Sequence, residues 1–308
     1  MGRESGRFVR FVVNGKAAAD PGLRAAVDAS RADGHRVEVR VTWERGDASR
    51  FAREAVGDGA EVIAVAGGDG TVNEVVNGVM DAGRDNGPAV AVVPYGTAND
   101  FATACGVPLA DPDAALTLAT GGRPSWIDVG RVNGKLFLNV ASGGLGAEIT
   151  ATTPPELKRL IGGAAYALMG LISAHQLSAY QATVTAGAHR AEGDLLMLSM
   201  GNSRLAGGGH PVAPRAMLDD GLLDLLAVHD ATPRDFPAML EELLDLDFND
   251  RRFVHYVQVA SAEFHFDREF QLNLDGEPIR AKHFEFDVLP RALSFVLPAG
   301  CDLVGAAA

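Results

Sequence analysis

The sequence predicts two domains, an α/β domain over residues 1–133 and a β-rich domain, built as an antiparallel sandwich, over residues 134–308. Two patterns predict this division. The first part alternates short apolar runs with helical patterns, which is typical of βαβ units and a mostly parallel sheet. The second part consists mainly of short strand-like runs separated by turn residues, which is typical of antiparallel sheets. The chain has 308 residues, of which 47% are hydrophobic, so it can bury two such cores.

Four apolar runs are expected to form the sheet of the α/β domain, with helical patterns such as residues 23–32 and 48–56 between them. The expected strands are Phe8 to Val13, Val37 to Val41, Val62 to Ala66 and Val90 to Val93. The pattern changes at residues 126–132, after which Asn133-Gly134 joins one strand-like run to the next. Asn-Gly is a strong signal for a two-residue hairpin, so the parallel part is expected to end there.

The second domain is expected to hold six further strands and two helical intervals. The strands are Ala182 to Ala186, Leu195 to Met200, Leu222 to Val228, Val254 to Val259, Phe270 to Leu274 and Ala292 to Val296. The helical patterns cover residues 155–177 and 233–246. The last strand could return to the first domain, so the boundary need not be a single cut.

The balance of charges limits the partners that the chain can have. It carries 27 Lys and Arg against 40 Asp and Glu, a formal net charge of −13, which argues against a nucleic-acid partner. Its two cysteines, Cys105 and Cys301, form no spacing typical of a zinc site or a disulfide framework. No export signal is visible, and the longest apolar stretch falls short of the roughly 20 residues that span a bilayer. These patterns predict a cytoplasmic protein.

The first candidate site is the turn Gly67-Gly68-Asp69-Gly70-Thr71, which follows an expected buried strand and precedes a helical pattern. Glycines let the backbone approach a phosphate closely, and the following helix offers free N–H groups and the positive end of its dipole. The turn matches neither the P-loop nor the dinucleotide-binding motif. The alternative is a tight turn in which Thr71 and Glu74 form a capping box, and the two can coexist.

A second turn of this kind, Pro94-Tyr95-Gly96-Thr97-Ala98-Asn99-Asp100, follows the next expected strand. Neighbouring parallel strands end at one edge of the sheet, so both turns are expected to face one crevice. Thr97 can donate to a phosphate oxygen, while Asp69 and Asp100 could bind Mg²⁺ or its waters. The alternative for Asp100 is capping of the following helix.

Together with three later motifs, these turns resemble a known family. The later motifs are Asn139-Val140-Ala141-Ser142-Gly143-Gly144-Leu145-Gly146, Asp220-Gly221-Leu222-Leu223 and Asp275-Gly276-Glu277-Pro278. The ordered set resembles the diacylglycerol-kinase-like lipid kinases, in particular their bacterial YegS-like branch, over nearly the whole chain. The resemblance implies the two-domain fold of NAD kinases and diacylglycerol kinases, with a Rossmann-like N-terminal domain and a β-sandwich. It also implies ATP-dependent phosphorylation of a hydroxyl on a membrane lipid, phosphatidylglycerol or a diacylglycerol-like lipid.

The same resemblance implies roles for individual residues. The implied nucleotide contacts are Thr42, Gly68, Asp69, Gly70, Thr71, Val72, Asn73, Glu74 and Thr97. Asp69, Asp100 and Glu277 are the candidate catalytic residues, with Glu277 as the acceptor of the proton from the lipid hydroxyl. The alternative for Glu277 is a solvated residue that follows an Asp275-Gly276 hairpin turn.

A structural metal ion is a further implication of the resemblance. The family's Mg²⁺, or Ca²⁺ in its place, maps to Met217, Asp220 and Leu222, of which two can offer only backbone carbonyls. The alternative is an ordinary acidic turn. Asp128 lies where family members often place an acidic residue of the active-site network, and a buried aspartate needs partners. It is expected to support the site.

The lipid substrate is expected to be reached at the bilayer surface. Residues 157–172 combine the basic pair Lys158-Arg159 with an apolar stripe at helical spacing, which could form a lip for an acyl chain. Helix packing is the commoner explanation of such a stripe. The protein is thus expected to visit the inner face of the membrane, and it could form a homodimer. Two rival functions stay open: a kinase of a soluble acceptor, as in NAD kinases, and a regulator that binds nucleotide or lipid without turnover.

Overall fold

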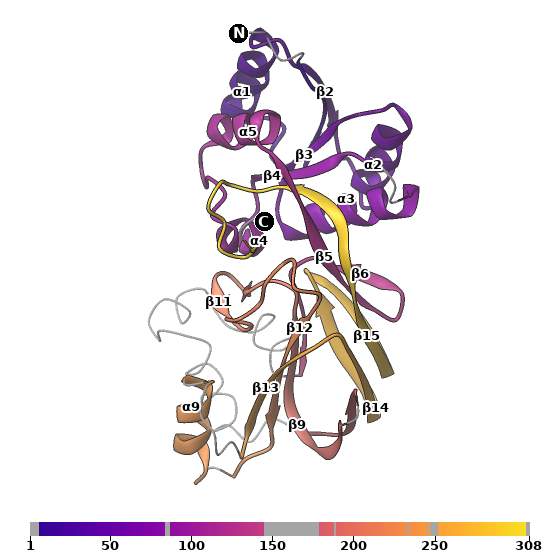
Figure 1. Cartoon of the computed structure of the whole chain (residues 1–308), viewed down its shortest axis with the longest axis vertical. Coiled ribbons are helices and arrows are strands. Elements are labelled where there is room, and N and C mark those ends of the chain that lie inside the picture. The colour runs from indigo at the N-terminus through magenta and orange to yellow at the C-terminus, as the bar shows by residue number, and fades with distance from the viewer. Residues whose placement is uncertain are drawn as a thin grey trace. The chain divides into compact units, whose positions relative to one another are not determined.

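The computed structural model describes residues 6–83, 87–144, 179–187, 189–232, 234–244, 246 and 252–305, and Figure 1 labels the helices and strands. The chain divides into two compact units, and neither is continuous in sequence. The first consists of Met1–Val129, Met217–Gly221 and Leu289–Ala308, and the second of Gly130–Ala216 and Leu222–Val288. The units therefore part within strand β5 (Pro124–Val132), just before the cut that the sequence suggests at residue 133.

A parallel sheet forms the centre of the first unit. Its strands lie in the order β2 (Arg36–Val41), β1 (Phe8–Val13), β3 (Val62–Gly67), β4 (Ala89–Pro94) and the end of β15 (Glu277–Val296). Every residue of β1, β3 and β4 is buried, as expected of a parallel sheet that is covered on both faces. The four strands predicted for this domain are confirmed.

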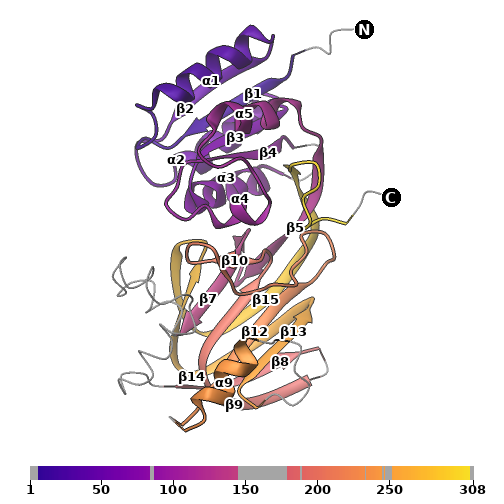
Figure 2. The same cartoon turned by 90° about the vertical axis from the view of Figure 1, so that its left-hand side faces the viewer.

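Helices cover this sheet on both faces (Figures 1 and 2). On one face, α1 (Pro21–Ala32) and α5 (Pro112–Gly121) pack together and share a core cluster with Val9, Phe11 and Val13 of β1. On the other face, α2 (Asp47–Gly57) packs against α3 (Asp69–Ala82). A fifth, short helix, α4 (Asp100–Ala104), follows β4.

The end of β15 completes the sheet of the first unit. Phe295 pairs in parallel with Val90 of β4, and its ring centroid lies 5.1 Å from that of Phe101 in α4. Val296 belongs to the core cluster that holds α5. The strand predicted over 292–296 is therefore the tail of a longer strand that returns to the first unit.

The second unit is built on an antiparallel sheet in which two short strands share one position. The order is β13 (Val254–Val259), β12 (Leu223–His229), β9 (His189–Gly201), then both β7 (Val140–Gly144) and β8 (Tyr180–Ala186), then β14 (Ser261–Leu274) and β15. β7 pairs with one end of β9 and β14, and β8 with the other end of the same two strands. Gly144 lies opposite Met197 and Tyr180 opposite Leu195, so the chain re-enters the sheet close to where it leaves.

Smaller elements complete the second unit. β6 (Lys135–Phe137) pairs with β5 across the Asn133-Gly134 turn, whose φ angles of 48° and 79° are those of a type I′ turn, so the predicted hairpin is confirmed. β10 (Leu205–Ala206) and β11 (His210–Pro211) form a two-stranded sheet. α9 (Phe236–Leu244) packs on β13, within the helix predicted over 233–246.

Strands β14 and β15 are much longer than the runs predicted over 270–274 and 292–296. Five of their inward residues are buried phenylalanines that contact one another: Phe264, Phe266, Phe270, Phe284 and Phe286. Most of the outward residues between them are charged or histidine. A strand with one solvated face contains no continuous apolar run, which is why the prediction was too short.

Two features predicted from the sequence cannot be compared with the structure. The helix expected over 155–177 and the apolar stripe of residues 157–172 lie outside the described residues. Within the described part of the chain, no helix is long and apolar enough to cross a bilayer.

Candidate active site

Two glycine turns meet at the carboxyl ends of β3 and β4. A Cβ atom placed on Gly96 would lie 2.4 Å from the Cα atom of Gly68, and one placed on Gly68 would lie 2.9 Å from the Cα atom of Gly96. The N–H of Tyr95 donates to the carbonyl of Gly67 at 2.9 Å. Glycine at both positions permits this approach because it has no side chain. The two turns therefore lie side by side, as their strands predict.

Asp69 fastens the first turn to the second. Its Oδ2 accepts a hydrogen bond from the N–H of Asp100, and its Oδ1 accepts one from the N–H of Phe101, each at 3.1 Å. These two amides open α4 and have no acceptor within their own helix. Asp69, at the start of α3, thus caps that helix, and the N-cap position is held by Asn99, so the idea that Asp100 is the cap was wrong. Burial raises the pKa of Asp69, its backbone hydrogen bonds oppose the rise, and the nearby Asp100 adds to it.

The capping box proposed for Thr71 and Glu74 is absent. Helix α3 already begins at Asp69, with Gly68 as its N-cap, so Thr71 lies inside the first turn. The Oγ1 of Thr71 accepts a hydrogen bond from Nδ2 of Asn14 at 3.1 Å. Oε2 of Glu74 accepts one from the N–H of Gly46 at 3.1 Å. Both side chains therefore reach neighbouring loops instead of each other's backbone, and this alternative was wrong.

A pocket of about 440 Å³ lies beside the first turn, within the first unit. Its lining residues are Asn14, Gly15, Lys16, Thr42, Trp43, Glu44, Arg45, Ala48, Thr71 and Glu74. It thus brings together Thr42, Thr71 and Glu74 from the predicted nucleotide set. Lys16 and Arg45 bring positive charge to it, and the Trp43 side chain is 94% exposed. Glu44 and Glu74 also line the pocket, so an anion would be attracted only locally, beside Lys16 and Arg45.

Hydrogen bonds hold the loop that carries Trp43. Oγ1 of Thr42 accepts from the N–H of Gly15 at 3.2 Å, and Oδ2 of Asp47 accepts from the N–H groups of Trp43 and Glu44 at 2.8 and 3.1 Å. The hydrogen bond from Trp43, followed by those from Arg50 and Glu44, lowers the pKa of Asp47 to about 2. Sequence reasoning missed Trp43 as a residue of this pocket. Its position directly after Thr42, just beyond the end of β2, could have indicated it.

The other predicted nucleotide residues divide into two groups. Gly70 and Thr97 are exposed at the two turns. Val72 and Asn73 are buried, at 3% and 6% exposure. The side chain of Val72 packs in the interior and that of Asn73 accepts a hydrogen bond from Asn77. The N–H of Val72 donates to the carbonyl of Gly68 at 3.1 Å, so this structure does not present either residue to a ligand.

The second unit carries the other predicted motif, and Asp275 anchors it. Asp275 and Gly276 have φ angles of 48° and 99° and form the turn between β14 and β15. The carboxylate of Asp275 accepts hydrogen bonds from the N–H groups of Leu138, Asn139 and Val140 at 2.6, 3.1 and 3.0 Å. Glu277 begins β15 and is half-buried. The motif is a hairpin turn, as the alternative stated, but a buried carboxylate fixes it and with it the position of Glu277.

Hydrogen bonds join Asn139 to residues 202–205 beside this turn. The carbonyl of Asn139 accepts from the N–H groups of Asn202 and Ser203 at 2.9 and 3.0 Å. Nδ2 of Asn139 donates to the carbonyl of Leu205 at 2.7 Å. Two buried oxygens, Oδ1 of Asn139 and Oγ of Ser203, have no hydrogen-bond partner among the described residues. Buried oxygens of this kind usually bond to ordered water.

Asp128 holds the turn that contains the predicted metal residues. Its Oδ2 accepts from the N–H of Gly221 at 2.7 Å and its Oδ1 from the N–H of Arg291 at 2.6 Å, all within the first unit. The fully buried Asp128 therefore has the partners that its sequence position requires. Burial raises the pKa of this carboxyl, its hydrogen bonds oppose the rise, and Asp220 and Asp219 add to it.

The donor atoms of this turn fit a hard cation. Asp128, Asp219 and Asp220 lie close enough for their charges to interact. Met217 and Leu222 flank them in sequence and have backbone carbonyls to offer. Carboxylates and carbonyls are the ligands that Mg²⁺ and Ca²⁺ prefer, so these residues are compatible with the metal implied by the sequence.

Both halves of the chain match known families. Residues 9–132 match the diacylglycerol kinase catalytic domain, and residues 139–297 match the YegS C-terminal NAD kinase beta sandwich-like domain. The chain belongs to the YegS-like lipid kinase family. A "Probable lipid kinase YegS-like" of Pseudomonas aeruginosa is 44% identical over 303 residues, which cover 96% of each chain. Another with this name, from Shewanella frigidimarina, is 40% identical over 294 residues, which cover 95% of this chain and 94% of the relative.

The fold is also that of a solved structure. A diacylglycerol kinase of Bacillus anthracis strain Sterne superposes with a TM-score of 0.72, covering 97% of this chain and 99% of that chain at 22% identity. Family membership confirms three predictions: the resemblance, the α/β plus β-sandwich fold and a kinase activity. The chain is therefore a lipid kinase of the YegS-like kind.

Proposed function

We propose that this kinase transfers the γ-phosphate of ATP to a hydroxyl of a membrane lipid, phosphatidylglycerol or a diacylglycerol-like lipid. The observation that carries the proposal is the pair of contacting glycine turns, joined by Asp69, beside the pocket that contains Lys16, Trp43 and Arg45. Phosphoryl transfer depends mainly on positioning and on charge stabilisation. A rigid pair of turns beside two cations suits both requirements.

The nucleotide is bound by the first unit in this proposal. Its phosphates lie against the turn from Gly68 to Thr71, where the first amides of α3 and the positive end of the helix dipole favour negative charge. The hydroxyls of Thr42 and Thr97 donate to phosphate oxygens. The exposed ring of Trp43 stacks on the base, because aromatic faces bind flat π-systems. Lys16 and Arg45 offset the phosphate charge.

Asp69 and Asp100 are the proposed Mg²⁺-binding carboxylates beside the phosphates. When bound, Mg²⁺ neutralises charge on the β- and γ-phosphates. Each oxygen of Asp69 already accepts one backbone hydrogen bond and keeps a second lone pair for a metal-bound water. Asp69 therefore has two tasks, to hold the second turn and to orient the hydrated cation.

Glu277 is the proposed proton acceptor. The lipid hydroxyl must lose its proton as it attacks the γ-phosphate, and a carboxylate within hydrogen-bond reach can take it. Asp275 holds the turn before Glu277 through three backbone amides, so the carboxylate of Glu277 starts from a fixed backbone.

A second cation is proposed at the turn held by Asp128, with Mg²⁺ or Ca²⁺ bound by the carboxylate of Asp220 and the carbonyls of Met217 and Leu222. Its task there is structural, because it offsets the mutual repulsion of Asp128, Asp219 and Asp220. Removal of divalent cations is expected to lower the melting temperature as well as the activity.

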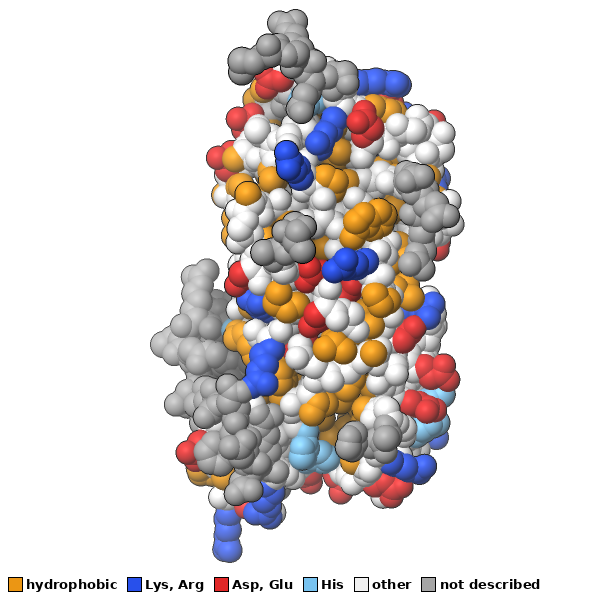
Figure 3. Space-filling model, viewed as in Figure 1, with side chains coloured by type: hydrophobic (Ala, Val, Ile, Leu, Met, Phe, Trp, Pro, Cys, Tyr) orange, Lys and Arg blue, Asp and Glu red, His pale blue; other side chains and the backbone are white. Residues whose placement is uncertain are grey.

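Contact with the membrane must overcome the net charge of −13. Acidic and basic side chains are interspersed on the face of the molecule shown in Figure 3, so attraction to an anionic bilayer is expected to be local. Divalent cations can bridge acidic side chains and anionic headgroups. We expect the enzyme to act transiently at the inner face of the membrane, with phosphorylation that is sensitive to ionic strength.

The test is an assay of the purified full chain with γ-labelled ATP, Mg²⁺ and mixed micelles of phosphatidylglycerol or diacylglycerol. Labelled lipid in the organic extract is the expected result. Glu277→Gln should lower the rate about 10²- to 10⁴-fold, the usual contribution of a general base. Glu269→Gln, at an exposed glutamate of β14, is the matched control and should keep full activity.

Other outcomes assign the reaction differently. Label that stays in the aqueous phase on an added NAD or sugar acceptor would support the rival soluble-acceptor kinase. A Glu277→Gln variant that is folded and fully active would refute the assignment of the proton acceptor, while leaving the lipid kinase itself intact.

A further inference from the structure

We propose that Glu263, His265 and His283 bind a divalent transition-metal ion, with Zn²⁺ as the representative, on the outer face of the β14–β15 hairpin. Among the described residues, these three form a group of His and carboxylate side chains whose ligand atoms all lie within 4.8 Å of one another. They belong to the second unit alone. The proposal does not depend on the kinase reaction.

Strand register brings the three side chains together. His265 of β14 lies directly opposite His283 of β15 in the antiparallel ladder. Glu263 is two residues before His265, so it projects from the same face of the sheet. On the inner face, the alternating residues Phe264 and Phe284 are fully buried and fix the two strands. The ligands thus project from a rigid pair of strands, which is the scaffold that a metal site needs.

Both imidazoles point at one carboxylate oxygen. Nε2 of His265 and Nε2 of His283 each lie 2.8 Å from Oε1 of Glu263. The two rings are stacked, with centroids 4.1 Å apart and planes 6° apart. Two nitrogens and one oxygen therefore converge on one point at the surface.

The spacing suits a tetrahedral ion after a small adjustment. Ligands about 2.0–2.2 Å from Zn²⁺ at tetrahedral angles are about 3.3 Å from one another. The nitrogens and the carboxylate oxygen need to separate by about 0.5 Å from their present contacts to admit the ion. The side chains of His265, Glu263 and His283 are 54%, 42% and 39% exposed, so they can move by this amount and leave a position for water.

The chemistry of the ligands selects the class of metal. Imidazole nitrogen favours Zn²⁺, Cu²⁺ and Ni²⁺, whereas Mg²⁺ and Ca²⁺ prefer oxygen. The surroundings add negative charge, since Oε1 of Glu285 lies 3.7 Å from Nε2 of His283. This site is therefore distinct from the oxygen-rich turn around Asp220.

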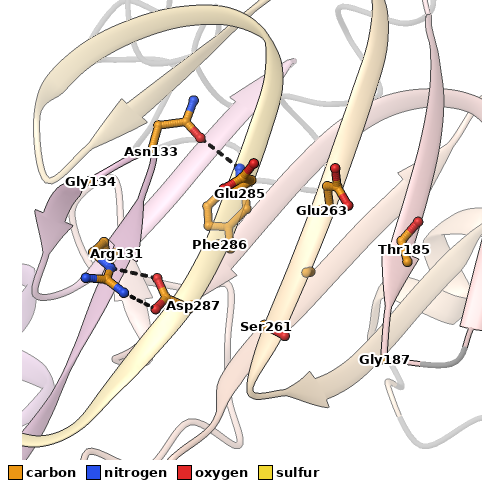
Figure 4. Close-up of a pocket in the computed structure, with 11 residues that line it drawn as sticks. Arg131, Asn133, Gly134, Thr185, Gly187, Ser261, Glu263, Glu285, Phe286 and Asp287 are labelled. Carbon is orange, nitrogen blue, oxygen red and sulfur yellow. Dashed lines mark hydrogen bonds and ion pairs between the residues drawn. The ribbon is translucent and has the colours of Figure 1, made fainter.

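The site adjoins a pocket of about 550 Å³ in the second unit (Figure 4). Glu263 and Glu285 line it, and Arg131 and Asp287 form a bidentate ion pair on its wall. Asn133 accepts from the N–H of Glu285 at 2.8 Å, which fixes the backbone next to the cluster. Solvent in this pocket has access to the carboxylate ligand, so a metal ion has a path of entry.

A bound ion would also join the two strands next to the point where their register shifts. The register of β14 and β15 is irregular between His265 and Phe270, so the His265–His283 pair is the last regular pair before the irregularity. An ion that binds the folded hairpin, and not the unfolded chain, raises the melting temperature as its concentration increases. Zn²⁺ is thus expected to stabilise the second unit.

The experiment is isothermal titration of the full chain with ZnCl₂ in millimolar Mg²⁺, which occupies oxygen-rich sites, followed by Co²⁺ titration to record the absorption bands of a tetrahedral ion. One Zn²⁺ per chain is expected at this site. His265→Ala, His283→Ala and Glu263→Gln should each weaken binding at least about tenfold. Zn²⁺ should raise the melting temperature of the wild-type chain and not that of His265→Ala.

The chain offers a matched control. His229 and His255 form a second histidine pair, with ring centroids 4.9 Å apart, and they are not part of the group that could hold a metal. His255→Ala should leave the Zn²⁺ affinity unchanged. Since His265 is exposed and Glu263 and His283 are partly exposed, their variants are expected to fold, and circular dichroism checks this. Absence of binding, or binding that His255→Ala removes and His265→Ala keeps, would overturn the proposal.

Discussion

The close contact between Gly68 and Gly96 predicts that adding one methyl group at Gly96 has a large effect on the enzyme. In Gly96→Ala, the new Cβ atom would lie 2.4 Å from Cα of Gly68 and 2.7 Å from Oδ1 of Asn99. Non-bonded carbons prefer about 3.5–4.0 Å, so the two turns must separate by about 1.3 Å. The φ angle of Gly96 is outside the left-handed region, so the contact, and not backbone strain, decides the outcome.

A shift of this size should disturb both stability and catalysis. Overpacking of a well-packed site costs about 1–3 kcal/mol of unfolding free energy. A misplacement of about 1 Å at reacting groups can lower the rate about a hundredfold. We therefore expect kcat/KM for ATP to fall between about tenfold and a hundredfold in the lipid phosphorylation assay, with a chain that still folds.

Gly57→Ala is the control for this experiment. Gly57 ends α2, and a Cβ placed there has no neighbour within 4 Å, so alanine should be neutral or slightly stabilising. If Gly96→Ala bound ATP and turned over like the wild type, the two turns would not form the phosphate site, and the reasoning that joins them to the pocket would fail.

Three further predictions follow from single side chains. Asp275→Ala should lower the unfolding free energy, measured in urea, by about 3 kcal/mol or more, because three backbone N–H groups lose their acceptor. If Asp275→Ala lost no more unfolding free energy than Asp275→Asn, the carboxylate would not be the anchor of the turn. Folding raises the pKa of Asp69 above its reference value of 3.8, so the stability it contributes is largest below pH 3.8 and is lost as the pH rises through the raised pKa. The unfolding free energy of the wild type should therefore fall relative to that of Asp69→Asn as the pH rises from 4 to 7. A difference between the two that does not depend on pH would contradict this. Trp43→Ala should raise KM for ATP about three- to tenfold, with melting temperature and kcat unchanged, since the ring is exposed and stacks only on the base; an unchanged KM would remove Trp43 from the nucleotide site.

The parallel part of the fold could be predicted because its signals are local. Strands that are buried on both faces are continuous apolar runs, as in residues 62–66 and 90–93. The glycine turns follow those strands directly, so parallel topology alone places them at one edge. The Asn133-Gly134 hairpin was equally readable, because a type I′ turn requires residues that accept a positive φ.

What the sequence did not reveal depends on distant partners. Asp69 looks like a residue of its own turn, yet its carboxylate caps a helix 31 residues away. The motif around Asp275 looks like a plain hairpin until the amides of residues 138–140 are seen to converge on it. Strands β14 and β15 were underestimated because half of each alternating strand faces solvent. The residue pattern within one segment does not predict the hydrogen bonds that a distant segment makes with it.

The return of β15 to the first sheet has a consequence for how the chain is made. Most of the first unit is translated first, but its sheet then lacks the residues around Phe295 that pair with β4 and pack on Phe101. At about 5–20 residues per second, ribosomes need about 10–30 s to proceed from Val129 to Phe295. During that time the edge of β4 is open, while the residues of the second unit emerge and can fold around their own phenylalanine core. The unit that begins the polypeptide is thus the last to be finished, and a fragment cut at residue 129 would keep that edge exposed permanently.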